Sequence, residues 1–206
     1  MPNVWLIASA LIGYLLGSLP FGYLMARAHG VDIFKAGSGN PGATNVKRVL
    51  GSKAGNTVFA LDALKGAVAA GWPLLPFFHA PDARMMGLVG VIAAVLGHSY
   101  SVFTQFKGGK GVATAAGGLV VLMPISCAIG GAVWVLTFLT TRYVSLGSIL
   151  AAIAVPTASW LRGNPLPLNI VATAVGVFVI VRHRENITRL FKGTESKFVK
   201  KPPEKN

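Results

Sequence analysis

The sequence predicts an all-α, polytopic membrane protein: a bundle of about seven spanning helices, some of them short. Of its 206 residues, 53% are hydrophobic and only 12% are charged, whereas soluble domains carry about 25% charged residues. Apolar runs of membrane length also recur along the chain, and a helix needs about 20 such residues to cross a bilayer. The first run starts at Val4 without a basic segment or a small-residue cleavage site. We therefore expect a retained helix rather than a signal peptide.

The charge balance predicts the orientation of the bundle. The chain has 19 Lys and Arg residues against 6 Asp and Glu residues, a formal net charge of +13. In a soluble protein this excess would suggest nucleic acid, but in a membrane protein basic residues gather in cytoplasmic loops and at anionic lipid heads. We expect contact with membrane lipid and none with nucleic acid. The N-terminus should lie outside and the C-terminus inside, with only Arg84, Arg162 and Lys65 away from the cytoplasmic regions. The single cysteine, Cys127, excludes an intrachain disulfide.

The first half of the chain contains three expected spans. Val4–Ala26 is the first, and Pro20 should kink it. Thr57–Phe78 and Met85–Phe103 follow. In the basic loop between the first two, Asn40–Pro41 is typical of a helix start, with Asn as the N-cap and Pro as the first helical residue.

The second expected span carries two ionisable residues, Asp62 and Lys65, spaced i,i+3. Ionisable groups within a membrane are costly unless they face the protein interior and pair. The spacing therefore predicts a structural ion pair near the cytoplasmic end of this span.

The segment Val112–Thr141 is too long for one simple span and has Pro124 near its middle. We expect two short helices broken at Met123–Pro124, because this break returns Arg142 to the cytoplasmic side. About 14 residues rise only about 21 Å, so such helices need shielding by the rest of the protein. The last two expected spans are Tyr143–Leu161 and Leu168–Val181.

The glycine-lysine stretch Lys107–Gly111 indicates a phosphate site. Glycines expose backbone N–H groups, lysines add charge, and a helix begins directly after them. It is not a nucleotide P-loop, because Gly111 rather than Ser or Thr follows Lys110. The alternative is a basic turn between two membrane helices.

Two further polar clusters are expected on the same cytoplasmic face. In the first, Gly37, Gly39 and Gly42 match GxGxxG, but no strand precedes them, so a dinucleotide site is not favoured. The other, Arg182–Leu190, is typical of an amphipathic interfacial helix. Its spacing puts His183, Asn186 and Leu190 on one face, and pairs Glu185 with Arg189 at i,i+4 on another.

Together the three clusters suit a phosphorylated substrate at the membrane surface. They are poor in carboxylates and contain too few Cys and His residues for zinc, so we expect no metal and no cofactor. The residues supplied are Ser38, Arg48, Lys107, Gly108, Gly109, Lys110, His183 and Asn186.

These clusters resemble the three sequence motifs of the bacterial membrane acyl-phosphate:glycerol-3-phosphate acyltransferases, the PlsY family. The similarity runs from the first span through Glu195. The matching positions are Gly37–Asn40, Gly42–Asn45 and Arg48; His98 and Phe106–Thr114; and His183, Asn186, Ile187, Arg189, Leu190, Gly193 and Glu195.

The resemblance implies transfer of an acyl group from acyl phosphate to the sn-1 hydroxyl of glycerol 3-phosphate, the first acylation step of phospholipid synthesis. Residues 1–195 would form a single integral membrane acyltransferase domain, and 196–206 a basic tail. The location implied is the bacterial inner membrane, with the active site facing the cytoplasm and a soluble PlsX-type phosphate acyltransferase supplying the donor.

The expected roles fall into three groups. Ser38, Arg48, His183 and Asn186 are assigned to catalysis. Asn40, Asn45, Lys107, Gly108, Gly109, Lys110, Ser145 and Ser148 are assigned to substrate binding. Glu195, Asp62 and Lys65 are assigned to structure. The proton acceptor is left open between His183 and the substrate's own phosphate.

Two other classes of protein fit the sequence less well. Acyltransferases that use CoA or a carrier protein have His-x-x-x-x-Asp, and no histidine of this chain is followed by Asp at that spacing. A small transporter of phosphorylated metabolites would place its polar residues near the bilayer midplane, often in paired repeats. Here the polar clusters share one face, which favours the enzyme.

Overall fold

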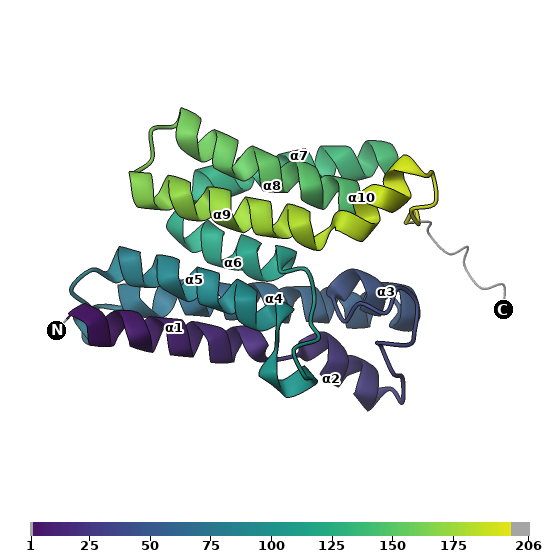
Figure 1. The fold of residues 1–206 in the computed structure, drawn as a ribbon, viewed down its shortest axis with the longest axis horizontal. Helices are drawn as coiled ribbons and strands as arrows, with labels where there is room; N and C mark the ends of the chain where they lie inside the picture. The colour runs from purple at the N-terminus through teal and green to yellow at the C-terminus, as the bar shows by residue number, and fades with distance from the viewer. Residues whose placement is uncertain (1, 199–206) are drawn as a thin grey trace.

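The computed structural model describes residues 2–198, and this part of the chain contains helices and no strand (Figure 1). The predicted all-α class is confirmed. Most of the expected tail, 196–206, lies outside the described residues. The α-helices are α1 (Pro2–Ser18), α2 (Phe21–Ala28), α3 (Ala43–Leu50), α4 (Ser52–Gly71), α5 (Ala83–Ser99), α6 (Val112–Leu122), α7 (Pro124–Thr141), α8 (Val144–Leu161), α9 (Leu166–Arg182) and α10 (Arg184–Phe191). Short 3-10 turns are η1 (Trp72–Leu74), η2 (Pro76–Phe78) and η3 (Val102–Thr104).

The bundle has two halves joined by α6. Helices α1 to α5 form one side, α7 to α10 form the other, and α6 lies between them (Figure 1). Small residues allow α4 and α6 to pack closely: a Cβ on Gly66 would lie 2.0 Å from the Thr114 carbonyl oxygen, and one on Gly117 would lie 1.9 Å from that of Ala63. Membrane helices, which gain little hydrophobic energy from association, depend on such contacts. This packing fixes the start of α6, where the glycine-lysine stretch ends.

Proline positions explain several helix boundaries. The predicted kink is present, because α1 ends at Ser18 and α2 begins after Pro20. The predicted break is also present, with Pro124 as the first residue of α7. Only α6 is short, however: α7 has 18 residues and is long enough to cross a bilayer, so the prediction of two short helices is wrong for α7. At the second expected span the structure has α4, which begins at Ser52 and ends at Gly71, and which is not among the helices apolar enough to cross a bilayer. It ends before two short 3-10 turns that contain Pro73 and Pro76, because proline cannot continue a helix.

The predicted helix start at Asn40 is wrong. Helix α3 begins only at Ala43, with Gly42 as its N-cap. The Asn40 side-chain oxygen accepts a hydrogen bond from the Gly42 N–H at 2.9 Å. Asn40 therefore shapes the turn before the helix rather than capping it.

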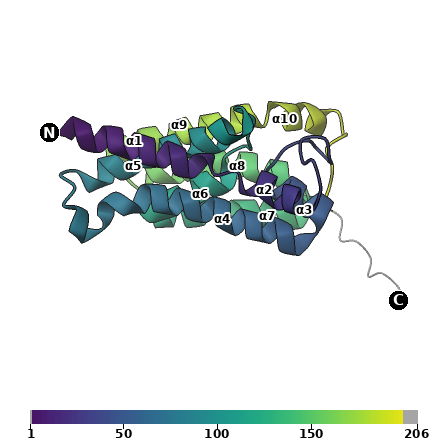
Figure 2. The ribbon, with the colours of Figure 1, turned by 90° about the horizontal axis from the view of Figure 1, so that it is seen from below.

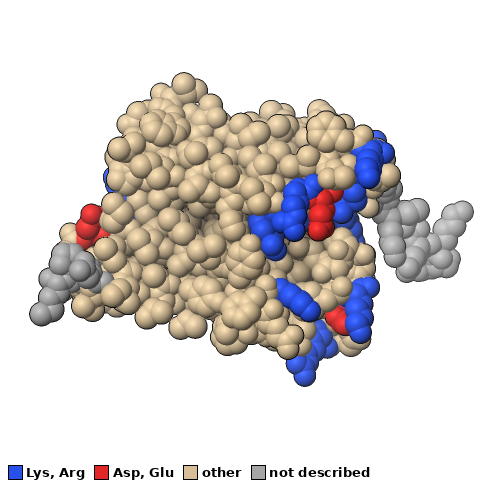
Figure 3. Space-filling view, in the orientation of Figure 1, with Lys and Arg blue, Asp and Glu red and all other residues tan. Residues whose placement is uncertain are grey.

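The outer surface is that of a membrane protein. Within residues 2–198, four helical segments are long and apolar enough to cross a bilayer, or five if the pair α9 and α10, bent by 57°, is one span. Large apolar side chains such as Leu11 (59% exposed) and Leu136 (64% exposed) point outward. Charged residues gather mainly at the end that carries α2, α3 and α10 (Figures 1 and 3). The count of seven spans and the N-out orientation remain predictions.

Candidate active site

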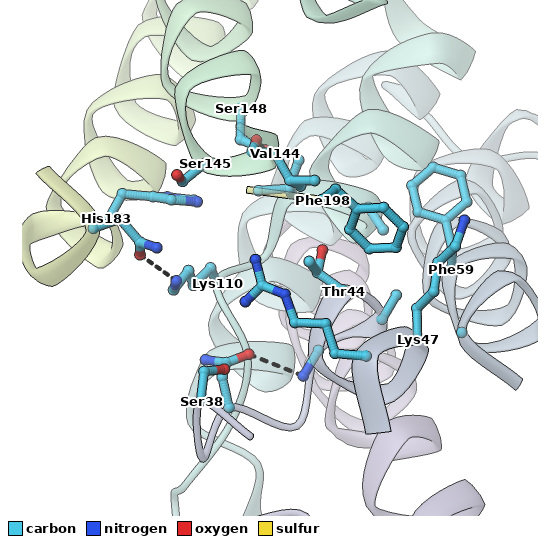
Figure 4. A pocket seen from close by; sticks show the side chains of 18 of the residues that line it. Ser38, Thr44, Lys47, Phe59, Lys110, Val144, Ser145, Ser148, His183 and Phe198 are labelled. Carbon is cyan, nitrogen blue, oxygen red and sulfur yellow. Dashed lines mark hydrogen bonds between the residues drawn. The ribbon is translucent and has the colours of Figure 1, made fainter. Parts of the chain in front are cut away.

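A cavity of about 490 Å³ is lined by side chains around α3 and α10 (Figure 4). These two helices lie at the same end of the bundle (Figure 2). Side chains from all three predicted motifs line the cavity, together with residues of α4, α7 and α8. Figure 4 shows Ser38, Lys110 and His183 facing one space from three different parts of the chain. The lining residues that the sequence predicted are Ser38, Asn40, Arg48, Asp62, Lys110, Ser145, Ser148, His183, Asn186 and Glu195.

The first motif is held in shape by Asn45. Its side-chain oxygen accepts a hydrogen bond from the Ser38 N–H at 2.8 Å, and its amide nitrogen donates to the Ala36 carbonyl at 2.9 Å. Asn45 is buried and does not line the cavity. The structure thus uses Asn45 to position Ser38 rather than to contact a substrate directly.

Lys110 supplies a half-buried cation to the cavity. Its ammonium donates a hydrogen bond to the side-chain oxygen of Asn186, which joins the second motif to the third. Burial lowers the pKa of Lys110 to about 8; the nearby Glu195 carboxylate opposes that shift and Arg189 adds to it. The side chain therefore carries its charge at neutral pH.

Lys107, Gly108 and Gly109 do not line this cavity. They border a narrow space of about 20 Å³ on the far side of His98. A Cβ on Gly108 would lie 2.1 Å from the His98 carbonyl oxygen, and one on Gly109 would lie 2.1 Å from the His98 Nε2. These glycines thus permit the loop to pack against His98. Arg182 holds the other side of the loop by donating to the carbonyls of Gly108 at 3.3 Å and Gly109 at 3.0 Å.

His183 is a neutral hydrogen-bond acceptor. Its Nδ1 lies 2.7 Å from the Val179 carbonyl oxygen, which can only accept, so Nδ1 carries the proton and Nε2 is unprotonated. Burial lowers the pKa of His183 to about 4, against the hydrogen bond to Val179, and the charge of Lys110 lowers it further. His183 therefore lines the cavity without a charge at physiological pH.

Glu195 ties the third motif to α8. One carboxylate oxygen accepts hydrogen bonds from Ser145 and Asn186, both at 2.7 Å, and the other accepts from Arg189 at 2.7 Å. Burial alone would raise the pKa of Glu195, but these hydrogen bonds outweigh it and hold the pKa below its ordinary value. The partner of Arg189 is therefore Glu195, and the predicted pairing with Glu185 is wrong, because the chain turns back after α10.

Comparisons with known proteins place this geometry in a family. A family model described as glycerol-3-phosphate acyltransferase matches residues 7–193. The chain belongs to this family.

The similarity to known relatives and solved structures extends over nearly the whole chain. The glycerol-3-phosphate acyltransferase of Aquifex aeolicus is 45% identical over 188 residues, covering 91% of this chain and 96% of the relative. That of Geobacter sulfurreducens is 46% identical over 188 residues, covering 91% and 94%. Two crystal structures of PlsY (YgiH), an integral membrane glycerol 3-phosphate acyltransferase, are each 43% identical to this chain. The glycerol 3-phosphate form superimposes with a TM-score of 0.87 and covers 94% of this chain and 96% of its own. The lysophosphatidic acid form gives 0.85, with 94% and 95% covered.

The predicted ion pair between Asp62 and Lys65 is present in the structure. The Lys65 ammonium lies 2.7 Å from the Asp62 carboxylate, and both side chains are buried. Lys65 also donates to the Leu19 carbonyl at 2.9 Å, and His98 Nδ1 lies 3.5 Å from Asp62. The pair joins α4 to the break between α1 and α2 and, through His98, to the glycine-lysine loop.

Ser145 and Ser148 line the cavity of this family member, but both are hydrogen-bonded within the protein. Ser145 donates to Glu195, and Ser148 donates to the Val144 carbonyl at 2.9 Å while accepting from the Trp134 indole at 3.2 Å. Among the residues the structure describes, no three His, Cys, Asp or Glu side chains are grouped to hold a metal ion.

Sequence reasoning missed several lining residues. They are the cation Lys47 and the aromatic side chains Phe59, Trp134, Phe138 and Phe198; Arg189, a motif position without an assigned role, also lines the cavity. Trp134 and Phe138 are spaced i,i+4 on α7, a pattern that predicts a shared helix face but not what that face meets. Nothing in the local sequence indicates that Phe198 reaches the cavity.

Proposed function

We propose that this member of the glycerol-3-phosphate acyltransferase family transfers an acyl group from acyl phosphate to the sn-1 hydroxyl of glycerol 3-phosphate. The products are 1-acylglycerol 3-phosphate and inorganic phosphate. The observation that carries the proposal is the convergence of three distant segments on one cavity, where Arg48 and Lys110 lie beside the neutral His183.

The cations of the cavity suit a reaction between two phosphorylated molecules. Lys47, Arg48, Lys110 and Arg189 all line it. Charge-assisted hydrogen bonds from such groups to phosphate oxygens are about twice as strong as neutral ones. The guanidinium of Arg48 donates to a backbone carbonyl, that of Ser196 at 3.1 Å. A phosphate is a stronger acceptor and would displace this contact.

The donor is a mixed anhydride, so no covalent enzyme intermediate is needed. The hydroxyl attacks the acyl carbonyl, and phosphate leaves with the electrons of the C–O bond. The cavity must align the two groups and stabilise the oxyanion. Asn186 accepts from Lys110 and donates one amide hydrogen to Glu195. Its second amide hydrogen and the Lys110 ammonium are the donors for the oxyanion.

The proton of the attacking hydroxyl has two acceptors in reach, with different basicities. Nε2 of His183 can accept a hydrogen bond from the hydroxyl and orient it. With a pKa of about 4, however, His183 is a weaker base than the departing phosphate, whose oxygen takes up the electron pair of the broken C–O bond. In this proposal His183 orients the hydroxyl and the departing phosphate takes the proton.

The proposed setting is the inner membrane, with the cavity facing the cytoplasm. Its support is the gathering of basic residues at the cavity end of the bundle (Figure 3), because such residues favour the cytoplasmic side. A cytoplasmic opening would accept glycerol 3-phosphate from solution and an acyl phosphate made by a soluble PlsX-type phosphate acyltransferase.

The test is turnover by purified protein in lipid nanodiscs with acyl phosphate and glycerol 3-phosphate, with lysophosphatidic acid measured by mass spectrometry. Arg48→Ala should lower kcat about a hundredfold, the usual effect of removing one charged group that stabilises the transition state. Arg184→Ala is the matched control, because Arg184 is exposed and does not line the cavity. Equal turnover with acyl-CoA as sole donor would refute the proposed donor.

A further inference from the structure

The segment Glu195–Phe198, here called the C-terminal strap, follows α10 and runs past α3 to the junction of α7 and α8. The strap starts with Glu195, which is bound to α8 and α10 as described above. The Ser196 carbonyl then accepts from Arg48 on α3 at 3.1 Å, and the Phe198 N–H donates to the Arg142 carbonyl at 2.9 Å. The Lys197 ammonium lies 5.3 Å from the centre of the Tyr143 ring. The strap therefore connects the first and third motifs at the cavity.

The last residue of the strap completes an aromatic wall. The Phe198 ring lines the cavity and lies 6.2 Å from the Phe138 ring, which stacks on Trp134 at 5.2 Å. Phe59 of α4 lines the same cavity, and Figure 4 shows Phe198 between Phe59 and Val144. The ring thus lies among side chains of α4, α7 and α8 that line the cavity.

The Phe198 ring has cationic side chains near it as well as apolar ones. The Lys47 ammonium lies 5.1 Å from the ring centre, and the neighbouring Arg48 donates to the strap itself. Phe138 and Trp134 of α7 form the apolar part of these surroundings. Phe198 therefore lies between the phosphate-binding cations and an apolar surface, which is the boundary that a molecule with a phosphate head and a hydrocarbon chain must cross.

We propose that Phe198 is a specificity-determining residue that packs on the carbonyl-proximal methylenes of the acyl chain and excludes water from the anhydride. The proposal rests on the proposed function above. It concerns a residue beyond the family match, which ends at residue 193. It also gives the aromatic side chains of α7 a common role, because they continue the apolar surface from Phe198 along the cavity wall.

Water exclusion has a measurable consequence, because water competes with glycerol 3-phosphate for the same carbonyl. In hydrolysis, a water oxygen bonds to the acyl carbon, the bond from that carbon to the phosphate oxygen breaks, and phosphate leaves with the electron pair. The water's protons go to phosphate and solvent, and the product is a free fatty acid. The ratio of fatty acid to lysophosphatidic acid therefore reports how well the carbonyl is shielded.

The experiment compares wild type, Phe198→Ala, Phe198→Leu and Phe191→Ala in nanodiscs, with palmitoyl phosphate as donor and both products quantified. Phe191 is the control because it is 90% exposed and does not line the cavity. Phe198→Ala should raise KM for the donor about fifteenfold, because about two methylenes return to water and each lowers the affinity about fourfold. It should raise the fatty acid ratio by a similar factor and leave KM for glycerol 3-phosphate unchanged. Phe198→Leu should recover most of both effects.

The outcomes separate the two proposals. If wild type forms no lysophosphatidic acid from palmitoyl phosphate but does so from palmitoyl-CoA, the proposed donor is wrong, and the same ratio measured with palmitoyl-CoA still tests Phe198. If wild type uses palmitoyl phosphate while Phe198→Ala keeps the wild-type ratio and donor KM, the role of Phe198 is overturned. A rise in KM for glycerol 3-phosphate alone would also overturn it, because Phe198 would then serve the polar substrate.

Discussion

Replacing Glu195 by Gln preserves the size of the side chain and removes its charge. The wild-type carboxylate accepts three hydrogen bonds, from Ser145, Asn186 and Arg189, each at 2.7 Å. A Gln oxygen can still accept from Ser145 and Asn186. The Gln amide, however, would place its hydrogens against the Nε–H of Arg189, which is also a donor. The variant therefore keeps two weakened bonds and loses the third.

The expected loss of stability follows from these hydrogen bonds. Hydrogen bonds to a charged group contribute about 1.5–3 kcal/mol and neutral ones about 0.5–1.5 kcal/mol, so weakening two of them costs about 2 kcal/mol. The Arg189 side chain is 39% exposed, so its pairing adds at most about 1 kcal/mol. A loss of about 2 to 3 kcal/mol lowers the melting temperature of a chain of this size by roughly 5 to 10 °C.

A thiol-reactive dye can measure this change, because the only cysteine, Cys127, is half-buried and becomes accessible on unfolding. Glu185→Gln is the matched control: Glu185 is an exposed residue of α10. The pKa of Glu195 is depressed from 4.5, so its stabilisation is present above that pH and is lost as pH falls through the folded value. The difference between wild type and Glu195→Gln should shrink in acid. Equal melting of Glu195→Gln and wild type at pH 7 would refute this account.

Three further predictions test other parts of the site. Raising the pH through about 8 should raise KM for glycerol 3-phosphate, because burial lowers the pKa of Lys110 to about 8 and Lys110 then loses its charge. In Lys110→Arg, KM should stay constant up to about pH 9.5, since a guanidinium stays protonated. Gly109→Ala should lower the melting temperature and raise KM for glycerol 3-phosphate, because the new Cβ would lie 2.1 Å from the His98 imidazole. Adding His98→Ala should restore part of the melting temperature. If the stability losses of the two single variants simply add in the double variant, the packing argument is wrong. In a cysteine-free background, an impermeant thiol reagent added outside cells should label Arg162→Cys and spare Lys53→Cys, and the reverse pattern would overturn the N-out orientation.

Several features of this protein could be predicted from local sequence. The high apolar content places the chain in lipid, where backbone N–H and C=O groups must find hydrogen-bond partners within the protein, and a helix supplies them within one segment. Pro20 and Pro124 break helices because proline lacks the N–H that a helix interior requires. The i,i+3 spacing of Asp62 and Lys65 on one helix was enough to predict their pairing. The three motifs were also visible as polar clusters, and they carried the resemblance to the family that the comparisons confirmed.

Contacts between distant segments could not be predicted in this way. Arg48 meets Ser196 across 148 residues of sequence, and helical periodicity carries no information at that distance. Gly108 and Gly109 were assigned to substrate binding, which remains a prediction, and only the fold shows that they pack against His98. A hydrophobic pattern shows that a face is buried or in lipid, but only tertiary packing decides which side chains meet a cavity. For this reason the sequence determined the membrane helices and the motifs, and the tertiary structure decided that Lys110, His183 and the C-terminal strap surround one space.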